Sequence, residues 1–309
     1  MLVLGEVRTA LLQNSGQIDG DACASVLALT AGEPVRLSWR PIAYAVSPDR
    51  LAGVDCGLPS ASRARVRGVG TVLARGTITG GRVVQGSAHA RVERGADRRL
   101  PWSHYMARPG VVEVLGKVKA ADVAEGFGGD PAPDGLDLGS IGARLVDLIQ
   151  ASRHLDRRAS FKAARTLVRW VAETGEPAIR FTVREDGLRT LRVVHAGPFT
   201  PAVLSLCEDL ALHDWLLTTV LRMAEKAGIG VRADAAARLA PAIDHLLHLW
   251  MPAAHVDPSL LPFWESLDRR SGFTRQWLTL VDRIRDQVAV NTLALLHATA
   301  ARKPGSRDI

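Results

Sequence analysis

Apolar and polar residues alternate along several stretches of the first 120 residues, and this pattern predicts β-strands. Residues 2–12 are extended in character, and residues 34–46 alternate with a period of two. A further strand is predicted at 111–118, after a Pro-Gly turn. Residues 21–29 are the one helix that we expect in this part, so the first part of the chain is β-rich.

A β-hairpin is predicted at the centre of this part. Residues 66–79 and 82–92 are rich in Val, Thr, Ile and Gly, and they flank the dipeptide Gly80-Gly81. Two consecutive glycines tolerate the positive φ angles of a tight hairpin turn. We therefore predict that the two stretches pair as antiparallel strands.

After residue 138 the pattern changes to the 3.6-residue period of helices. Residues 138–151 carry Ile141, Leu145, Leu148 and Ile149 on one stripe. Two alternating stretches around Glu185-Asp186-Gly187 predict a second hairpin, which either edges the helical part or returns to the first sheet. The hairpin strands are placed at 178–184 and 188–195, and further helices at 160–173, 200–227, from 235 or 241 to 251, 258–270 and 274–301.

The two parts are separated by a stretch that favours neither regular structure. Residues 126–135 read Gly-Phe-Gly-Gly-Asp-Pro-Ala-Pro-Asp-Gly, a composition typical of linkers. We predict an α+β chain with a basic β-rich domain at 1–120, folded as a small sandwich or barrel-like, and a linker at 121–138. A mostly helical domain with one β-hairpin follows at 139–309.

No segment is expected to span a membrane, and the protein is expected in the cytoplasm. The longest mostly apolar stretch, Val288–Ala301, is interrupted by Asn291, Thr292 and His297 and is too short to cross a bilayer. The N-terminal residues lack the basic region of a secretion signal. The cysteines, at 23, 56 and 207, indicate neither a disulfide framework nor a paired-thiolate zinc site.

The positive charge of the chain is concentrated in its first part. Residues 1–120 hold 16 basic residues (Lys and Arg) and 9 acidic ones (Asp and Glu), whereas the remainder holds 23 basic and 23 acidic residues. The whole net charge of +7 therefore lies before residue 121. A basic binding face would produce this asymmetry. An Arg-rich, Ala-rich composition of the kind that a GC-rich genome encodes is the other explanation.

Two groups of helical residues are candidate metal ligands. An adjacent His-Asp on a helix, as in His213-Asp214, is what helical metal-dependent phosphohydrolases use, and Asp209 shares a helical face with His213. His245 and His248 are three residues apart and lack the catalytic Glu of zinc sites with two helical histidines. For both groups we favour a structural role. His213 would be buried and hydrogen-bonded to Asp209. His245 and His248 would lie near the C-terminal end of a helix, where the helix macrodipole favours histidine.

A loop that interleaves basic and aromatic residues is a candidate surface for nucleic acid or anions. Basic side chains bind phosphates, and exposed rings stack on bases. The alternative is that Trp102 and Tyr105 anchor the loop on the core while its arginines pair with Glu93 and Asp97. The candidate residues are Arg98, Arg99, Trp102, His104, Tyr105 and Arg108.

The common catalytic and nucleotide-binding motifs do not occur in the chain. Gly68, Gly70 and Gly76 lack the dinucleotide-binding spacing and sit in a hairpin, and no phosphate-binding Gly-Lys-Ser/Thr loop is present. No serine occupies a strand-turn-helix elbow, and Cys207 lies in a helix without a matched histidine. We therefore expect no cofactor and assign no catalytic residue.

Several stretches resemble a family of uncharacterised actinomycete proteins. They are Leu4-Gly-Glu-Val-Arg-Thr, the twelve residues from Arg40 to Leu51, Val54-Asp-Cys, Leu100-Pro-Trp-Ser-His-Tyr and the twelve residues from Leu206 to Leu217. The family has no assigned activity, so the resemblance transfers no site onto these positions. Its members are similar to parts of a gene neighbourhood with a P-loop ATPase-like protein and a methyltransferase-like protein, which implies a multi-protein system.

The sequence therefore favours a non-enzymatic interaction or scaffold component with protein partners, and the resemblance implies a P-loop ATPase-like protein among them. Two alternatives remain: a metal-dependent phosphohydrolase that uses the helical His and Asp residues, and a nucleic-acid-binding module that uses the basic first part. Nucleic acid is the less favoured partner, and no membrane partner is expected.

Overall fold

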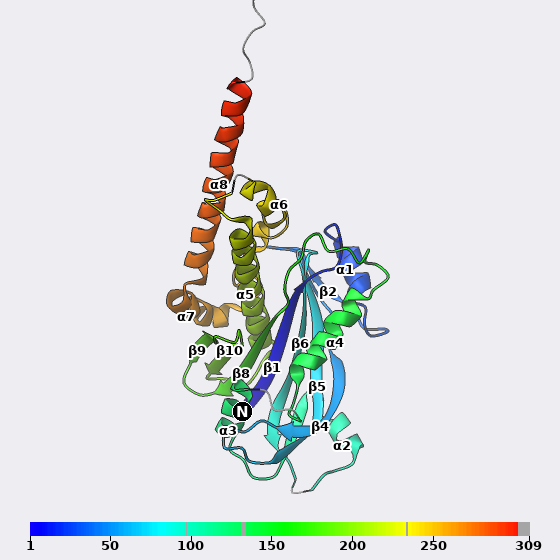
Figure 1. The fold of residues 1–309 in the computed structure, drawn as a ribbon. Coiled ribbons are helices and arrows are strands. Elements are labelled where there is room, and N and C mark those ends of the chain that lie inside the picture. The colour runs from blue at the N-terminus through cyan, green and yellow to red at the C-terminus, as the bar shows by residue number, and fades with distance from the viewer. Residues whose placement is uncertain (97, 131–133, 233, 302–309) are drawn as a thin grey trace, which may run out of the picture. The chain divides into compact units, whose positions relative to one another are not determined.

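The computed structural model describes residues 1–96, 98–130, 134–232 and 234–301, and the chain is α+β as predicted (Figure 1). One mixed sheet has the strand order β2-β3-β5-β7-β6-β1-β8-β10-β9, with β4 paired to β5. The strands are β1 (Leu2–Leu11), β2 (Arg36–Ser38), β3 (Tyr44–Val46), β4 (Arg50–Leu58), β5 (Val66–Thr79), β6 (Val83–Arg94), β7 (Val111–Leu115), β8 (Thr166–Thr174), β9 (Ala178–Val183) and β10 (Arg189–His195). The helices are α1 (Gly20–Leu27), α2 (Trp102–Met106), α3 (Ala120–Gly128), α4 (Leu138–Gln150), α5 (Pro201–Ala227), α6 (Ala235–His245), α7 (Leu261–Ser271) and α8 (Phe273–Ala301), with short 3-10 helices η1 (Leu247–Leu249) and η2 (Pro258–Leu260).

The hairpin predicted around Gly80-Gly81 is confirmed. β5 and β6 pair antiparallel, with Thr79 opposite Val83 next to the turn. Gly80 and Gly81 have φ angles of 57° and 59°. This left-handed conformation at both central residues matches the twist of the flanking strands, so local sequence determines the turn.

Strands from both predicted domains lie in the same sheet. β1 lies between β6 and β8 and is antiparallel to both, and β10 pairs parallel with β8. The second hairpin, β9-β10, therefore returns to the first sheet. The predicted N-terminal sandwich or barrel-like domain is not a separate sheet, because β1 connects the N-terminal strands to β8 within one ten-stranded sheet. In this sheet β4 pairs with β5 outside the main strand order, and β5 also pairs directly with β6.

The helix predicted at 160–173 is wrong, because Thr166–Thr174 forms strand β8. Val168, Trp170 and Ala172 alternate into one core and are fully buried. Pairing with β1 on one side and β10 on the other outweighs the local helical pattern. Strand β4 and the short helix α2 were not predicted.

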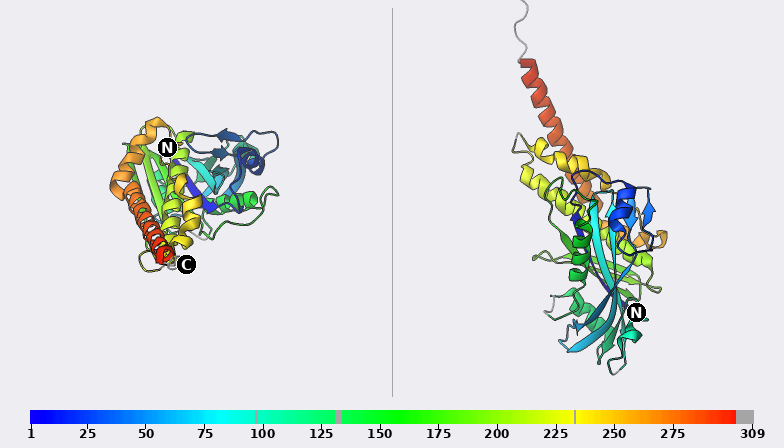
Figure 2. Two further views of the ribbon diagram at one scale, coloured as in Figure 1. Left: turned by 90° about the horizontal axis from the view of Figure 1, so that it is seen from above. Right: turned by 90° about the vertical axis from the view of Figure 1, so that its right-hand side faces the viewer.

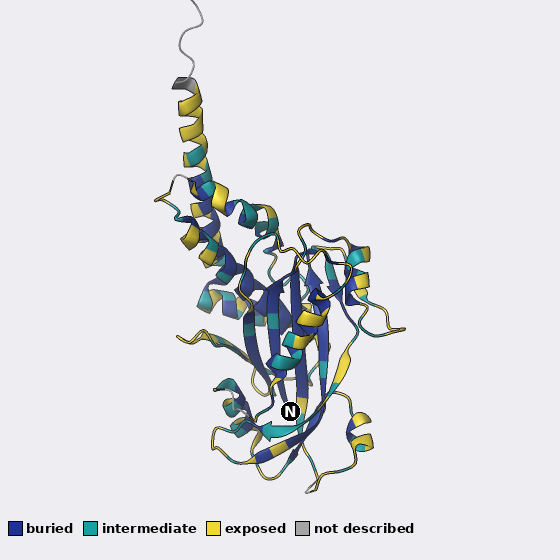
Figure 3. Cartoon of the chain, turned by 45° about the vertical axis from the view of Figure 1, so that its right-hand side comes forward, coloured by how far each residue is buried: buried dark blue, intermediate teal, exposed yellow. Residues whose placement is uncertain are grey.

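Each face of the sheet packs against a different set of helices (Figure 2). Leu2 and Leu4 of β1 belong to the core with α1, α3 and α4. Val3 and Val7 of the same strand belong to the core with α5 and α7. Because alternate residues of a strand point to opposite faces, β1 contributes to both cores, and Figure 3 shows the central strands buried along most of their length.

The segment predicted as a linker, 121–138, is part of the folded structure where it is described. Helix α3 covers Ala120–Gly128, and its Val123 and Phe127 are buried in the core with α4. Leu136 is buried in the same core, and the side chain of Asp137 accepts a hydrogen bond from the backbone N–H of Ser140 and caps α4. Residues 131–133 lie outside the described ranges.

The chain divides into two compact units whose limits differ from the predicted domains. Unit 1 comprises Met1–Trp215 and Met251–Ser271, which include the whole sheet, and unit 2 comprises Leu216–Trp250 and the chain from Gly272. In unit 2, Trp250 stacks on Trp277 of α8 with ring centroids 4.3 Å apart. The division follows helix packing and not the Gly- and Pro-rich stretch.

Helix α4 approaches β6 so closely that the two backbones touch at a pair of glycines. A Cβ atom added at Gly142 would lie 2.7 Å from the carbonyl oxygen of Gly86, which is closer than real Cβ contacts. We predict that Gly142→Ala lowers the free energy of unfolding by about 1–3 kcal/mol, because the helix must move off the sheet. Urea denaturation measures this change.

Gly128, at the end of α3, is the matched control because no atom lies within 4 Å of its added Cβ. Gly128→Ala should leave stability unchanged or raise it by up to about 1 kcal/mol. Equal effects of the two substitutions would contradict the backbone contact between α4 and β6.

Candidate functional site

The sheet face toward α5 carries polar side chains on β5 and β6, and these are buried. Arg75 and Thr77 of β5 and Gln85 and Ser87 of β6 are at most 5% exposed. On an amphipathic hairpin such residues would face water. Here α5 covers them, so each needs a hydrogen-bond partner inside the protein.

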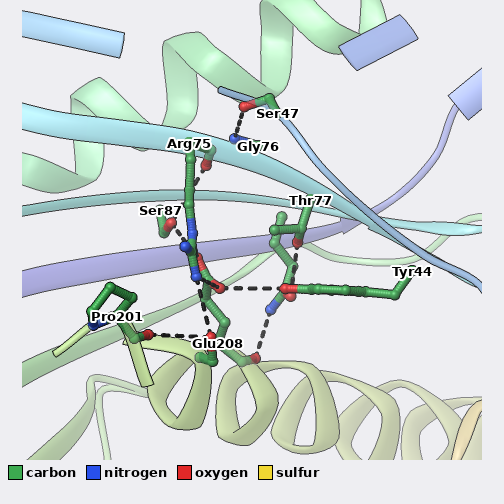
Figure 4. A network of polar contacts seen from close by, with 10 residues as sticks. Tyr44, Ser47, Arg75, Gly76, Thr77, Ser87, Pro201 and Glu208 are labelled. Atoms are coloured by element: carbon green, nitrogen blue, oxygen red, sulfur yellow. Dashed lines mark hydrogen bonds and ion pairs between the residues drawn. The ribbon is translucent and has the colours of Figure 1, made fainter. Parts of the chain in front are cut away.

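Glu208 of α5 supplies the central partner (Figure 4). Arg75 donates from Nε to Oε1 at 2.9 Å and from Nη2 to Oε2 at 2.6 Å, which is a bidentate ion pair. Ser87 donates its hydroxyl to Oε1 at 2.5 Å, and the Tyr44 hydroxyl donates to Oε2 at 3.4 Å. Each carboxylate oxygen of Glu208 therefore accepts two hydrogen bonds.

Gln85 extends the network to the backbone of α5. Its amide nitrogen donates to the Glu208 carbonyl at 3.0 Å and to the Thr9 hydroxyl at 3.1 Å, while its amide oxygen accepts from Thr77 at 3.2 Å. β1, β5, β6 and α5 are joined through one side chain. The network holds the N-terminal half of α5 on the sheet.

The ionisation of the network is fixed by burial and by the ion pair. Burial lowers the pKa of Arg75, but the charge and hydrogen bonds of Glu208 outweigh burial and raise it. Burial, and then the negative charge of Glu208, raise the pKa of Tyr44 well above its usual range. The four donors to Glu208 occupy both oxygens of its side chain within the protein. We interpret this cluster as structural.

The predicted metal ligands on α5 are used in internal contacts. The ring Nδ1 of His213 lies 2.7 Å from the backbone oxygen of Asp209 and 3.4 Å from its carboxylate. The Asp209 carboxylate also accepts the Ala253 backbone N–H at 2.9 Å. Asp214 forms an ion pair with Arg189 at 2.5 Å. Each carboxylate thus has a protein partner.

His245 and His248 lie at the end of α6 and in η1, which belong to unit 2, whereas Asp209, His213 and Asp214 belong to unit 1. Within the described ranges, no three His, Cys, Asp or Glu side chains form a group suited to hold a metal ion. The predicted metal ligands therefore form no such group among these residues.

Most basic residues of the predicted anion-binding loop are paired with carboxylates. Arg99 lies 3.0 Å from Asp55, and His104 lies 2.7 Å from Glu113. Arg108 pairs with both Glu93 and Glu113. These pairs reduce the charge that the loop presents to a phosphate. Glu113 is buried on β7, and the sequence pattern did not indicate its role.

The two aromatic residues of the loop, Tyr105 and Trp102, differ in how far they are exposed to solvent. Tyr105 is buried, and its hydroxyl accepts the Leu100 backbone N–H at 3.0 Å, so it anchors the loop. Trp102 is 40% exposed, and the Arg99 guanidinium lies 5.4 Å from its ring centre. Arg98 is exposed and has no hydrogen bond or ion pair with any described residue. Arg98, Arg99 and Trp102 are the exposed residues of the predicted surface, and Arg99 is paired with Asp55.

The most unusual exposed surface lies on the second half of α8, here called the distal segment (288–301). It contains no charged residue. Its larger apolar side chains are strongly exposed: Leu293 57%, Leu296 58%, Val290 60% and Leu295 68%. Figure 3 shows this segment mostly in the colour of exposed residues. Isolated exposed leucines are common, but a continuous group on one helix indicates an interaction site.

No family model, curated protein or solved structure matches the chain. Among the described residues, no helix has the length and hydropathy needed to cross a membrane.

We predict that Arg75→Met lowers the free energy of unfolding by about 3–5 kcal/mol, because it leaves the Glu208 carboxylate buried without its counter-charge. The double variant Arg75→Met with Glu208→Leu should recover a large part of this loss, since no unpaired charge remains. Urea denaturation of the two single variants and the double variant measures the coupling. Additive losses would contradict the interpretation that the pair anchors α5.

A second prediction concerns nucleic acid. We expect dissociation constants for DNA and RNA weaker than about 1 µM at physiological salt, because most cations of the loop are paired. Arg98→Ala with Arg99→Ala should therefore leave the salt dependence of binding nearly unchanged. Fluorescence anisotropy over a salt series measures both. Submicromolar, salt-sensitive binding that is lost in this variant would establish the nucleic-acid alternative.

Proposed function

We propose that the protein is a non-enzymatic interaction component of a multi-protein system, and that the distal segment of α8 is its docking surface. The observation that carries this proposal is the change in α8 near residue 287. Before it, α8 is an ordinary amphipathic helix. After it, α8 is apolar and exposed.

The first half of α8 has one buried side and one charged side. Phe273, Trp277 and Ile284, which belong to unit 2, are buried. Arg275 and Asp282 lie on the opposite side, because residues three to four apart share a face of an α-helix and these are offset from the buried stripe. This half satisfies the usual pattern of a surface helix and needs no partner.

In the distal segment, apolar side chains also occupy the side of the helix that is charged in the first half of α8. Val290, Leu293 and Leu296 follow one another at three-residue steps and lie on the side that carries Asp282 in the first half. Leu295 lies on the side of the buried stripe, where it is exposed. A helix that is apolar on opposite sides is normally buried, which supports a complex in which another protein surrounds this segment.

A protein partner agrees better with the segment than a lipid bilayer does. The segment has 14 residues, and at 1.5 Å per residue it is about 21 Å long, shorter than the roughly 30 Å hydrocarbon core. A helix that lies on a membrane surface carries many Lys and Arg on its polar face, and this segment has none. Helix-in-groove docking uses apolar residues at such spacings.

The identity of the partner is proposed from the resemblance described above. A P-loop ATPase-like protein encoded near the related genes is the first partner to test. The residues paired within the protein, among them Glu208, Asp209 and Arg108, agree with a non-enzymatic role, because their polar groups are used in internal contacts.

We predict that Leu293→Glu with Leu296→Glu weakens partner binding more than tenfold, because two carboxylates would be buried in an apolar interface. A photo-crosslinking amino acid at position 293 of the full-length chain, in the native host, identifies the partner. Affinity of the purified pair is then measured for the native protein and for the double variant.

Leu278→Glu is the matched control. Leu278 is 55% exposed on the first half of the same helix, outside the proposed surface. This variant should keep native affinity, and all variants should keep their helical circular dichroism. Unchanged binding by the double variant, or an equal loss with Leu278→Glu, would contradict the proposed docking surface.

A further inference from the structure

A cavity of about 890 Å³ lies in unit 1 where the ends of β6 and β7 meet the start of α3. It is far from the distal segment in sequence and does not involve α8. Its volume is within the range of sites that bind small molecules. Its lining comes from the end of β6, the end of β7, the connection from β7 to α3, the start of α3 and residues 62 and 64.

The inner wall of the cavity is aliphatic. Val114 of β7 and Val123 of α3 are buried in the protein, and Val92 of β6 and Val118 are half-buried. Among the residues that the structure describes, no aromatic side chain lines the cavity. A flexible apolar chain fits this wall, whereas a base or another flat ring would find no ring on which to stack.

The outer part of the cavity carries three cations. Arg94, Lys117 and Lys119 are exposed. They come from the end of β6 and from the connection between β7 and α3. Cations of one sign around a low-dielectric wall attract a negatively charged group.

The two carboxylates of the lining are used elsewhere. Glu93 forms ion pairs with Arg91 at 2.6 Å and with Arg108. Asp122 accepts hydrogen bonds from Ser62, at 2.7 Å from the hydroxyl and 2.8 Å from the backbone N–H. Hydrogen bonds from Ser60 and Ser62 lower the pKa of Asp122, with a smaller contribution from Lys119. Glu93 is thus paired with other arginines, and the lining presents three cations against the one remaining carboxylate, Asp122, so it keeps a positive balance for a ligand.

We propose that this cavity binds an amphipathic anion, namely a small molecule with an unbranched aliphatic chain and one carboxylate. The chain lies against the valines, and the carboxylate lies among Arg94, Lys117 and Lys119. A cation of the same chain length is repelled by the three positive side chains. This site is independent of the docking surface on α8.

The test uses decanoate, octanoate and decyltrimethylammonium with the full-length protein, each below the concentration at which it forms micelles. Isothermal titration calorimetry should show one saturable site for decanoate. Decanoate should bind about tenfold more tightly than octanoate, because two further methylene groups are buried. Decyltrimethylammonium should bind at least tenfold more weakly than decanoate, and added salt should weaken decanoate binding.

Two variants localise the site. Lys117→Gln with Lys119→Gln should weaken decanoate binding about tenfold or more. Ala120→Trp should abolish it by filling the cavity entrance. The control Lys162→Gln removes an exposed lysine that does not line the cavity, and its affinity should equal that of the native protein.

The proposal is overturned by any of three results: no saturable decanoate site, equal binding of the cationic and anionic chains, or decanoate affinity that neither variant changes. Because the lysines are exposed, their substitution should leave the unfolding transition in place. A calorimetric scan of each variant checks this, and loss of partner binding through α8 has no bearing on the outcome.

Discussion

The ion pair between Arg75 and Glu208 is the constraint on which the arrangement of unit 1 depends. Neither charge tolerates burial without the other, because an isolated buried ion costs several kcal/mol. Their bidentate contact therefore specifies which turn of α5 lies over which residue of β5. Ser87 and Gln85 bind the same residue of α5, so a shift of the helix by one turn would leave several buried groups without partners.

The two faces of the sheet use different physical solutions. Toward α4 the contact is apolar and close, with the glycines at 86 and 142 allowing the backbones to touch. Toward α5 the contact is apolar over β8 and β10 but polar over β5 and β6. Polar layers of this kind add specificity when every member has a partner. The metal-ligand candidates of α5 lie outside this polar layer and have other partners within the protein, as Asp214 has in Arg189 of β10.

The surfaces that remain for recognition lie away from these buried networks. The distal segment of α8 offers uncharged leucine and valine side chains, and the cavity beside α3 offers valines with three lysine and arginine side chains. One is suited to a protein and the other to a small anionic molecule. The interaction role proposed from the sequence and the resemblance therefore has a specific surface with which it can be tested.

The sequence by itself determined the elements whose signals are local: the glycine turn of the first hairpin, the strand β1, the helix α5, which was predicted at 200–227, and the uncharged run at 288–301. Tertiary structure decided the rest. The pattern of residues 160–173 predicted a helix, yet pairing with β1 on one side and with β10 on the other made residues 166–173 part of a strand. The contact between Asp209 and His213 was predicted correctly, because the two residues are one turn apart on the same helix. The ion pair between Asp214 and Arg189 was not predicted, because Arg189 lies on a strand that is distant in the sequence. Local pattern reports the period of a segment, but burial and ion pairing depend on which segments meet, and that information is distributed over the whole chain.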